Sequence, residues 1–232
     1  MSTVNESAAM DTQPANTLPG AMDEVLSTGV FVTFEGGEGV GKSTHIKILA
    51  ERLIAAGFGV VQLREPGGTT LSEKIRTLLL DPDSDVAAQA ELLLYEAARA
   101  QLVTERILPA LASGAVVLCD RYLDSTTAYQ GYGRRIDLAL IAQANQLGSL
   151  GVLPTRTILM VDNWQEALAR ARALGTDRLE AEDFDFHQRV NLGFEQIAAD
   201  HKDRVRIVRL QKSIEATAEL IYAELADLFE AT

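Results

Sequence analysis

Hydrophobic positions along the chain follow two alternating patterns. Five short apolar runs, rich in β-branched residues, occupy Val30–Phe34, Val60–Leu63, Val116–Cys119, Thr157–Val161 and Val205–Leu210. Longer stretches between them carry apolar residues at every third or fourth position. Short buried strands that alternate with helices are typical of βαβ units, so the pattern predicts an α/β fold with a parallel sheet.

The longest predicted helix covers Val86–Leu111 and carries two arginines on an otherwise apolar face. The residues that share this face by helical spacing are Leu92, Tyr95, Arg99, Leu102 and Arg106. An ordinary core-facing helix would not place arginines there, so this face is a candidate binding surface. A capping box, Thr70 followed by Glu73, predicts the start of the preceding helix.

A glycine-rich turn joins the first predicted strand to the helix that follows it. The turn fits the phosphate-binding pattern G-x-x-x-x-G-K-[ST] in the strand–loop–helix context that the pattern requires. Its residues are Gly36, Gly37, Glu38, Gly39, Val40, Gly41, Lys42, Ser43 and Thr44. Backbone N–H groups there can hold phosphate oxygens, while Lys42 can reach the β- and γ-phosphates of ATP and Ser43 can ligate Mg²⁺.

Charged residues stand at the ends of the next two strands, where ligand loops lie in doubly wound sheets. Arg64 ends the second strand, and Asp120 and Arg121 follow the third. An Asp after four apolar strand residues can hold Mg²⁺ through its water shell. A helix-capping Asp beside a surface Arg is the alternative interpretation of this pair.

Three further arginines, Arg170, Arg172 and Arg178, flank Gly175 and Thr176 in an otherwise helical region. A lid over residues 166–183 that carries arginines would exclude water and stabilise charge on a phosphoryl group in transfer. A solvated helix face with Glu166 and Glu180 as ion-pair partners is the alternative.

Composition limits the function further. The 232 residues are 47% hydrophobic and 23% charged, which suits one compact domain over 29–232. A net charge of −12 disfavours binding to nucleic acid or to an anionic membrane, and no apolar run approaches the roughly 20 residues that span a bilayer.

Residues 1–28 lack signal-peptide features and are expected to be a disordered tail or to follow a wrongly assigned start codon. The single cysteine, Cys119, lies in an apolar run, and a reducing cytoplasm is the expected compartment.

Four segments in this order resemble the bacterial type of thymidylate kinases: FEGGEGVGKST, REPGGT, CDRYLDSTTAYQGYGR and the arginine-bearing lid. The resemblance covers about residues 29–230. It implies a P-loop NTPase fold with a five-stranded parallel sheet flanked by helices. It further implies Mg²⁺-dependent phosphoryl transfer from ATP to dTMP, which gives ADP and dTDP for dTTP synthesis.

The resemblance also assigns the acceptor site. Tyr95 would stack on thymine, where the family usually has Phe, and Arg99 would donate a hydrogen bond to the base edge. The other residues implied for the acceptor are Ser125, Thr126 and Gln130 around the base, Arg76 and Arg121 at its phosphate, and Glu38 near the sugar hydroxyl. No general base is expected, because a nucleoside monophosphate is already largely dianionic near pH 7.

One absence subtypes the chain within the family, and one further position departs from the family pattern. The P-loop carries no arginine, so the lid is expected to supply one, either Arg172 or Arg178. Arg135 stands where a glycine is common, which puts the local loop shape in question. The family forms homodimers by helix packing, and the apolar faces of Val86–Leu111 and Ile136–Leu147 could serve this purpose or belong to the core.

Two alternative functions stay open at this point. One is a kinase for another nucleoside monophosphate or a deoxynucleoside, because residue spacing alone does not demonstrate a pocket for the thymine methyl group. The other is a module that binds ATP without turnover. The absence of Asn-Lys-x-Asp and Asp-x-x-Gly disfavours a GTPase.

Overall fold

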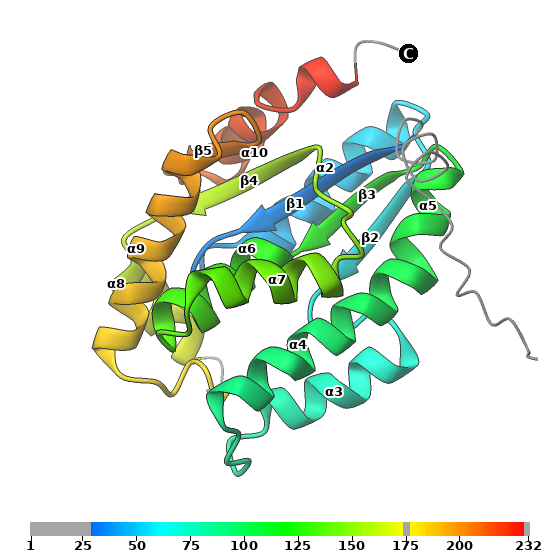
Figure 1. The fold of residues 1–232 in the computed structure, drawn as a ribbon. Coiled ribbons are helices and arrows are strands. Elements are labelled where there is room, and N and C mark those ends of the chain that lie inside the picture. Colours follow the sequence, from blue (N-terminus) through cyan, green and yellow to red (C-terminus); the bar gives the residue numbers. More distant parts are fainter. Residues whose placement is uncertain (1–28, 174–176, 230–232) are drawn as a thin grey trace, which may run out of the picture.

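A computed structural model describes residues 29–173 and 177–229. The predicted tail at 1–28 and Gly175 and Thr176 of the predicted lid lie outside these ranges. Five strands form one parallel sheet in the order β2-β3-β1-β4-β5 (Figure 1). They are β1 (Val30–Glu35), β2 (Val60–Arg64), β3 (Val116–Asp120), β4 (Arg156–Val161) and β5 (Val205–Arg209). Each predicted strand is confirmed to within one residue at either end.

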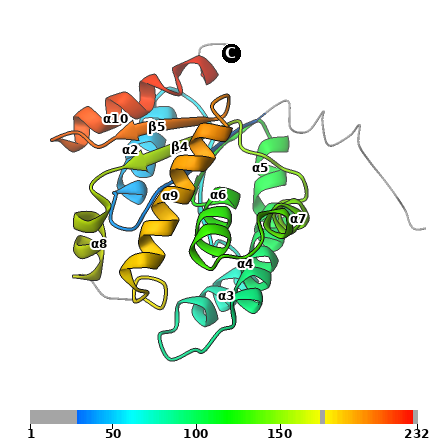
Figure 2. The ribbon, with the colours of Figure 1, turned by 60° about the vertical axis from the view of Figure 1, so that its left-hand side comes forward.

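Helices cover both faces of the sheet, and this explains why its strands read as continuous apolar runs (Figures 1 and 2). The α-helices of the described ranges are α2 (Lys42–Ala55), α3 (Thr70–Leu80), α4 (Ala88–Leu102), α5 (Leu108–Ala112), α6 (Leu123–Thr126), α7 (Leu138–Gly148), α8 (Trp164–Arg172), α9 (Phe184–Asp200) and α10 (Ile214–Ala223). Two π-helical segments, η1 (Val103–Ile107) and η2 (Thr127–Gly133), and one 3₁₀ turn, η3 (Ala226–Leu228), complete the described elements.

Alternate residues of the central strand β1 enter different cores. Val32 and Phe34 pack in the cluster that contains Ile46 of α2, whereas Phe31 packs in the cluster that contains Leu102 of α4. Since all strands are parallel, their carboxyl ends meet at one edge of the sheet. The P-loop and the segment that begins at Arg121 both leave the sheet at that edge.

The prediction of one helix over Val86–Leu111 is wrong in detail. The helix begins at Ala88, and the π-helical turn η1 interrupts it before α5. Pro109 gives the physical reason, because its ring lacks an N–H and would clash with the carbonyl four residues earlier in a regular α-helix. Arg106 lies in this turn and is exposed, whereas Arg99 is buried, so the two arginines do not share one binding face.

The predicted capping box at Thr70 is also wrong, by one residue. Thr69 is the N-cap of α3, and its hydroxyl accepts a hydrogen bond from the Ser72 backbone N–H at 3.1 Å. Glu73 accepts from the Gly68 N–H at 2.8 Å and does not close a box on Thr70. Both threonines match the sequence preference, but only Thr69 has the extended backbone that a cap requires.

Arg135 takes the backbone conformation that glycine would favour. Its φ of 61° lies in the left-handed region. The loop after η2 therefore has a glycine-like backbone conformation despite the arginine, and the question that the sequence raised about the shape of this loop is answered.

The cap assignment predicts a stability difference between neighbouring threonines. Replacing Thr69 by Ala should lower the free energy of unfolding by about 1 kcal/mol, because the Ser72 N–H loses its acceptor. Thr70→Ala is the matched control and should change it by less than about 0.5 kcal/mol, since Thr70 is exposed. Urea unfolding of the two variants measures both values, and equal losses would contradict the assignment.

Candidate active site

The P-loop wraps between the end of β1 and the start of α2. A Cβ at Gly36 would collide with the Met160 carbonyl oxygen, and one at Gly39 would collide with that of Ala167. Both glycines also have positive φ, so the packing of the loop itself requires them. Gly37 has room for a Cβ, so neither the backbone nor its neighbours explain this glycine.

Lys42 and Ser43 open α2 and face different partners. The Lys42 Nζ donates to the carbonyl oxygens of Gly36 at 3.1 Å and Gly37 at 2.8 Å, so the ammonium lies inside the loop. Burial and the nearby charge of Arg121 lower the pKa of Lys42 from its ordinary value. The exposed Ser43 hydroxyl donates to Asp120 Oδ2 at 2.6 Å, which joins the P-loop helix to the end of β3.

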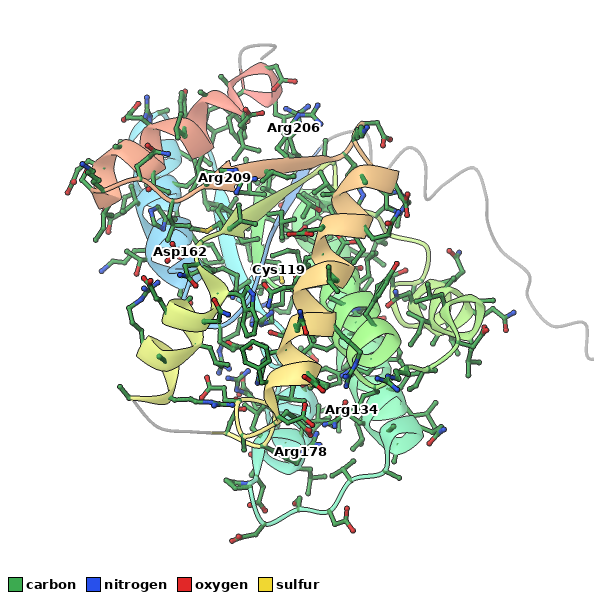
Figure 3. The ribbon with its side chains drawn as sticks, turned by 90° about the vertical axis from the view of Figure 1, so that its left-hand side faces the viewer. Cys119, Arg134, Asp162, Arg178, Arg206 and Arg209 are labelled. Atoms are coloured by element: carbon green, nitrogen blue, oxygen red, sulfur yellow. The ribbon has the colours of Figure 1, made fainter. Side chains whose placement is uncertain are left out.

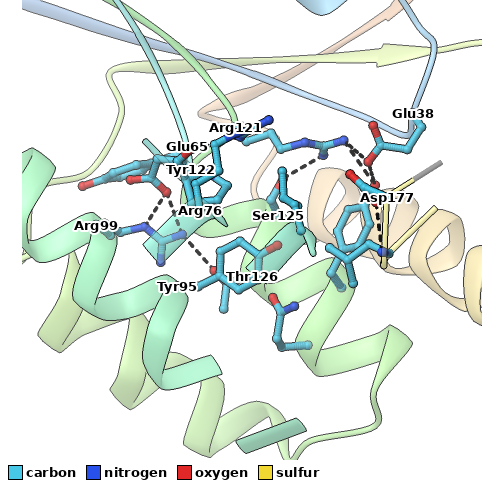
Figure 4. Close-up of a pocket in the computed structure, with 15 residues that line it drawn as sticks. Glu38, Glu65, Arg76, Tyr95, Arg99, Arg121, Tyr122, Ser125, Thr126 and Asp177 are labelled. Atoms are coloured by element: carbon cyan, nitrogen blue, oxygen red, sulfur yellow. Dashed lines mark hydrogen bonds and ion pairs between the residues drawn. The ribbon is translucent and has the colours of Figure 1, made fainter. Parts of the chain in front are cut away.

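A pocket lined by polar, charged and aromatic side chains opens beside the P-loop (Figure 4). All eight residues that the resemblance assigned to the acceptor line it: Glu38, Arg76, Tyr95, Arg99, Arg121, Ser125, Thr126 and Gln130. They come from the P-loop, α3, α4 and the segment after β3. The fold thus brings together residues that lie up to 92 positions apart in the sequence.

Arg121 connects this pocket to the P-loop. Its guanidinium donates to the Gly36 carbonyl at 3.1 Å, to the Ser125 hydroxyl at 3.1 Å and to Glu38 at 2.5 Å (Figure 4). The Tyr129 hydroxyl also donates to Glu38, at 2.9 Å. Burial raises the pKa of Glu38, but the charges of Arg121 and Lys42 outweigh it, and the pKa falls to about 2.

Arg99 is only 1% exposed, and each nitrogen of its guanidinium has a protein partner. Its Nε donates to Glu65 at 2.9 Å, and its Nη2 donates to the Thr126 hydroxyl at 2.8 Å (Figure 4). Nη1 is held by Glu96 and Asn145, neither of which lines the pocket. The Nη2 side of the guanidinium therefore faces the pocket.

Arg76 and Tyr95 form another part of the wall. Arg76 donates to the Pro66 carbonyl oxygen at 2.9 Å, which holds its guanidinium at the pocket (Figure 4). Tyr95 is half-buried, and burial raises the pKa of its phenol. Within the described ranges no residue forms a hydrogen bond with this hydroxyl.

The lid arginines differ in their partners. Arg172 donates to the carbonyl oxygens of Glu180 and Glu182, and Arg178 donates to the Leu79 carbonyl and pairs with Glu91 at 2.6 Å. Arg170 pairs with Asp162 and donates to Gly39 of the P-loop at 3.4 Å. In the contacts of the described residues, Arg170 is the one of these three that touches the P-loop, whereas Arg178 is held by α3 and by Glu91 of α4.

Comparison with known proteins agrees with this geometry. The family model for thymidylate kinase matches residues 34–221. The chain belongs to the thymidylate kinase family. A thymidylate kinase of Gloeobacter violaceus is 48% identical over 195 residues, which cover 83% of this chain and 92% of that protein. One from Caldanaerobacter subterraneus is 38% identical over 193 residues, which cover 83% and 93%. The crystal structure of thymidylate kinase from Ehrlichia chaffeensis superposes with a TM-score of 0.70 at 34% identity and covers 85% of this chain and 98% of that one.

Membership of the thymidylate kinase family confirms the predicted P-loop NTPase fold with its five-stranded parallel sheet. Sequence reasoning nevertheless missed several polar residues of the site, namely Glu35, Glu65, Glu91 and Tyr129. Tyr129 lies four and eight residues after Ser125 and Arg121, and Glu91 lies four before Tyr95. Helical spacing was the signal that would have placed Tyr129 and Glu91 on the same faces as the assigned residues.

The donor set at the P-loop fits Mg²⁺. Ser43 offers a hydroxyl and Asp120 a carboxylate, both oxygen ligands, next to the loop. No cluster of three or more His, Cys, Asp or Glu residues that could hold a metal occurs in the described ranges. Mg²⁺ usually takes one or two protein ligands and completes its shell with water and substrate phosphates, so a sparse donor set suits it.

No helix in the described ranges is both long and apolar enough to cross a membrane.

Glu35, at the end of β1, is the most perturbed carboxyl beside the site. It is fully buried and accepts hydrogen bonds from the Tyr122 N–H at 2.7 Å and from the Ser125 hydroxyl at 2.6 Å. Burial raises its pKa to about 8, and the charge of Asp124 adds to this shift against the opposing effects of Ser125 and Arg121. A proton on Glu35 is therefore favoured near neutral pH.

This shift predicts how stability depends on pH. The unfolded carboxyl loses its proton near pH 4.5 and the folded one near pH 8, so Glu35 makes the free energy of unfolding fall as pH rises across this interval. In Glu35→Gln, an isostere of the protonated acid, that contribution should vanish. The difference between wild-type and variant curves from urea unfolding should decline from about pH 4.5 to about pH 8 and then level off. Exposed Glu51→Gln is the control and should leave the wild-type curve unchanged; a flat difference for Glu35→Gln would contradict the shift.

Proposed function

We propose that this chain transfers the γ-phosphoryl group of ATP to dTMP and so forms ADP and dTDP. An oxygen of the dTMP phosphate attacks the γ-phosphorus, and the bond from that phosphorus to the bridging oxygen of ADP breaks. The observation that carries the proposal is the pocket, which shares Glu38 with the P-loop and is joined to that loop by the hydrogen bonds of Arg121. A donor and an acceptor phosphate would meet there.

The donor side follows from the P-loop. Its N–H groups and the N-terminus of α2 would bind the phosphates of ATP, and Lys42 would move from its loop carbonyls to the β- and γ-phosphates. Mg²⁺ is proposed as the cofactor, with Ser43 and Asp120 to hold it. When bound, it neutralises charge on the phosphates and orients them.

On the acceptor side, Arg76 and Arg121 would bind the dTMP phosphate and hold it against repulsion from ATP. Tyr95 presents an aromatic face on which the base can stack, and the Nη2 side of Arg99 would be shared between Thr126 and a carbonyl of the base. Phosphoryl transfer needs positioning and charge neutralisation more than proton abstraction, so we assign no general base.

For the lid, Arg172 and Arg178 remain the proposed candidates for stabilising the transferred group. Arg170 joins them because it lies nearest to the P-loop, where the γ-phosphate would be. Each of these three arginines would have to leave a carbonyl or carboxylate partner in order to reach the transferred group, as happens when a lid closes on substrate.

We also propose that the chain forms a homodimer in the cytoplasm. Helices α4 and α7 pack against each other and expose leucines that a second copy could cover, including Leu93 and Leu147, which are 66% and 75% exposed. Sedimentation equilibrium of the full chain distinguishes dimer from monomer. The lone Cys119 is buried, as a reducing compartment permits.

A panel of acceptors tests the function. ADP release with ATP and Mg²⁺ should be fastest with dTMP and slower with dUMP, because the arginines select a monophosphate and the pocket selects the base. The remaining acceptors in the panel are dCMP, UMP, CMP, AMP, GMP and thymidine. Preference for another of these would keep the phosphoryl-transfer chemistry but reject dTMP as the acceptor, and no turnover with any would favour a module that only binds ATP.

A further inference from the structure

Glu91 is a buried carboxylate that the proposed reaction does not use. It lies in the first turn of α4, is 0% exposed and points away from solvent beside the acceptor pocket without lining it. Arg134 donates to it from Nε at 3.1 Å and from Nη2 at 3.0 Å, and Arg178 pairs with it at 2.6 Å. Figure 3 shows Arg134 and Arg178 near each other at the start of α9.

A third side chain, that of Gln130, completes the partners of Glu91. The Gln130 Nε2 donates to Glu91 Oε1 at 2.7 Å. Burial raises the pKa of Glu91, but hydrogen bonds from Arg134 and Gln130, together with the arginine charges, outweigh it and lower the pKa. Glu91 is thus ionised and can only accept hydrogen bonds.

An acceptor-only neighbour fixes the side-chain amide of Gln130. If the amide were turned over, its carbonyl oxygen would face the Glu91 carboxylate at hydrogen-bond distance with no proton between them. The Gln130 Oε1 must therefore point away from Glu91. Gln130 is 1% exposed and lines the pocket, and no residue in 29–173 or 177–229 donates to this oxygen. An acceptor on a pocket-lining side chain that has no donor among the described residues can take a hydrogen bond from a ligand.

We infer that Glu91 is a positioning residue that sets base specificity, because it orients Gln130 so that its Oε1 accepts the N3–H of the acceptor base. This inference rests on the proposed function and names the group that reads the base. N3–H is the only hydrogen-bond donor on the thymine ring of dTMP, since N1 carries the sugar. In the same orientation cytosine would present the N3 lone pair to the same oxygen, and two acceptors would face each other.

Uracil has the same N3–H as thymine, so this contact does not discriminate between them. A kinase for dTMP makes two separate selections, one against cytosine and one for the methyl group of thymine. Glu91 and Gln130 reject cytosine, whereas the thymine methyl group must be read elsewhere in the pocket. This separation makes dUMP an internal control.

Binding of dTMP, dUMP and dCMP to Glu91→Gln, measured by isothermal titration calorimetry, tests the inference. Gln at position 91 can donate or accept, so Gln130 would no longer be held in one orientation. The preference for dTMP over dCMP should fall on the order of tenfold, the equivalent of one hydrogen bond, while the preference for dTMP over dUMP stays unchanged. Binding of ADP should also stay unchanged, because Glu91 lies away from the P-loop.

The matched control is Glu182→Gln. It removes another carboxylate partner of Arg134 by the same substitution, without contact to Gln130, and should leave the dTMP-to-dCMP ratio unchanged. Gln130→Leu keeps Glu91 and both arginines and should lower the ratio as far as Glu91→Gln does. In the double variant, Glu91→Gln should have no further effect on the ratio, since the two residues act through one contact.

The binding affinities of these variants distinguish a positioning role of Glu91 from a purely structural one. A parallel loss of dTMP, dUMP and dCMP affinity in Glu91→Gln would overturn the inference and leave Glu91 a purely structural group. If Glu91→Gln fails to fold, an unchanged ratio in Gln130→Leu would overturn it equally. A wild-type protein that bound dTMP and dCMP alike would instead reject the proposed function together with the inference.

Discussion

The ion pair between Arg121 and Glu38 holds the two halves of the site together. Glu38 belongs to the P-loop, and Arg121 follows β3, so the pair connects the strands at the centre of the sheet. Arg121 has a φ of 68°, a conformation that a non-glycine residue adopts at a cost of about 1–3 kcal/mol and that clusters at functional sites. Its bonds to Gly36, Ser125 and Glu38 compensate for that strain and direct the guanidinium towards the place where two phosphates would meet.

Buried acidic side chains orient other polar residues of the site. Glu35 accepts from Ser125, Glu65 from Arg99, and Glu91 from Gln130. In each case an acidic residue that is nearly or fully buried fixes the direction of a group that lines the pocket. Glu65 and Glu38 likewise hold Arg99 and Arg121, so a protein with a net charge of −12 orients these arginines of its pocket through acidic neighbours.

The strands and the P-loop could be predicted because their signals are local. A β-branched run buried on both faces, or a glycine turn between strand and helix, specifies its own structure. The predicted bounds of the long helix and the predicted N-cap of α3 were wrong because a single residue or its backbone conformation decided them. Pro109 widens the long helix into a π-turn, and the backbone at Thr69, rather than the residue type, selects the cap.

The residues that line the site could be predicted from the sequence, but the contacts between them could not. Resemblance to a family named the eight acceptor residues, and the structure lines one pocket with all of them. The partners of those residues could not be read from the sequence, because Glu91 meets Gln130 across 39 positions and Glu65 meets Arg99 across 34. Such contacts depend on how α4 packs against the segments that follow β2 and β3, and no periodicity within one element encodes that packing.

A crystal structure of the full chain with dTMP would show whether the acceptor phosphate meets the P-loop. We expect the phosphate between Arg76 and Arg121, facing the P-loop, with the base stacked on Tyr95. A phosphate turned away from the P-loop, or a nucleotide bound outside this pocket, would contradict it.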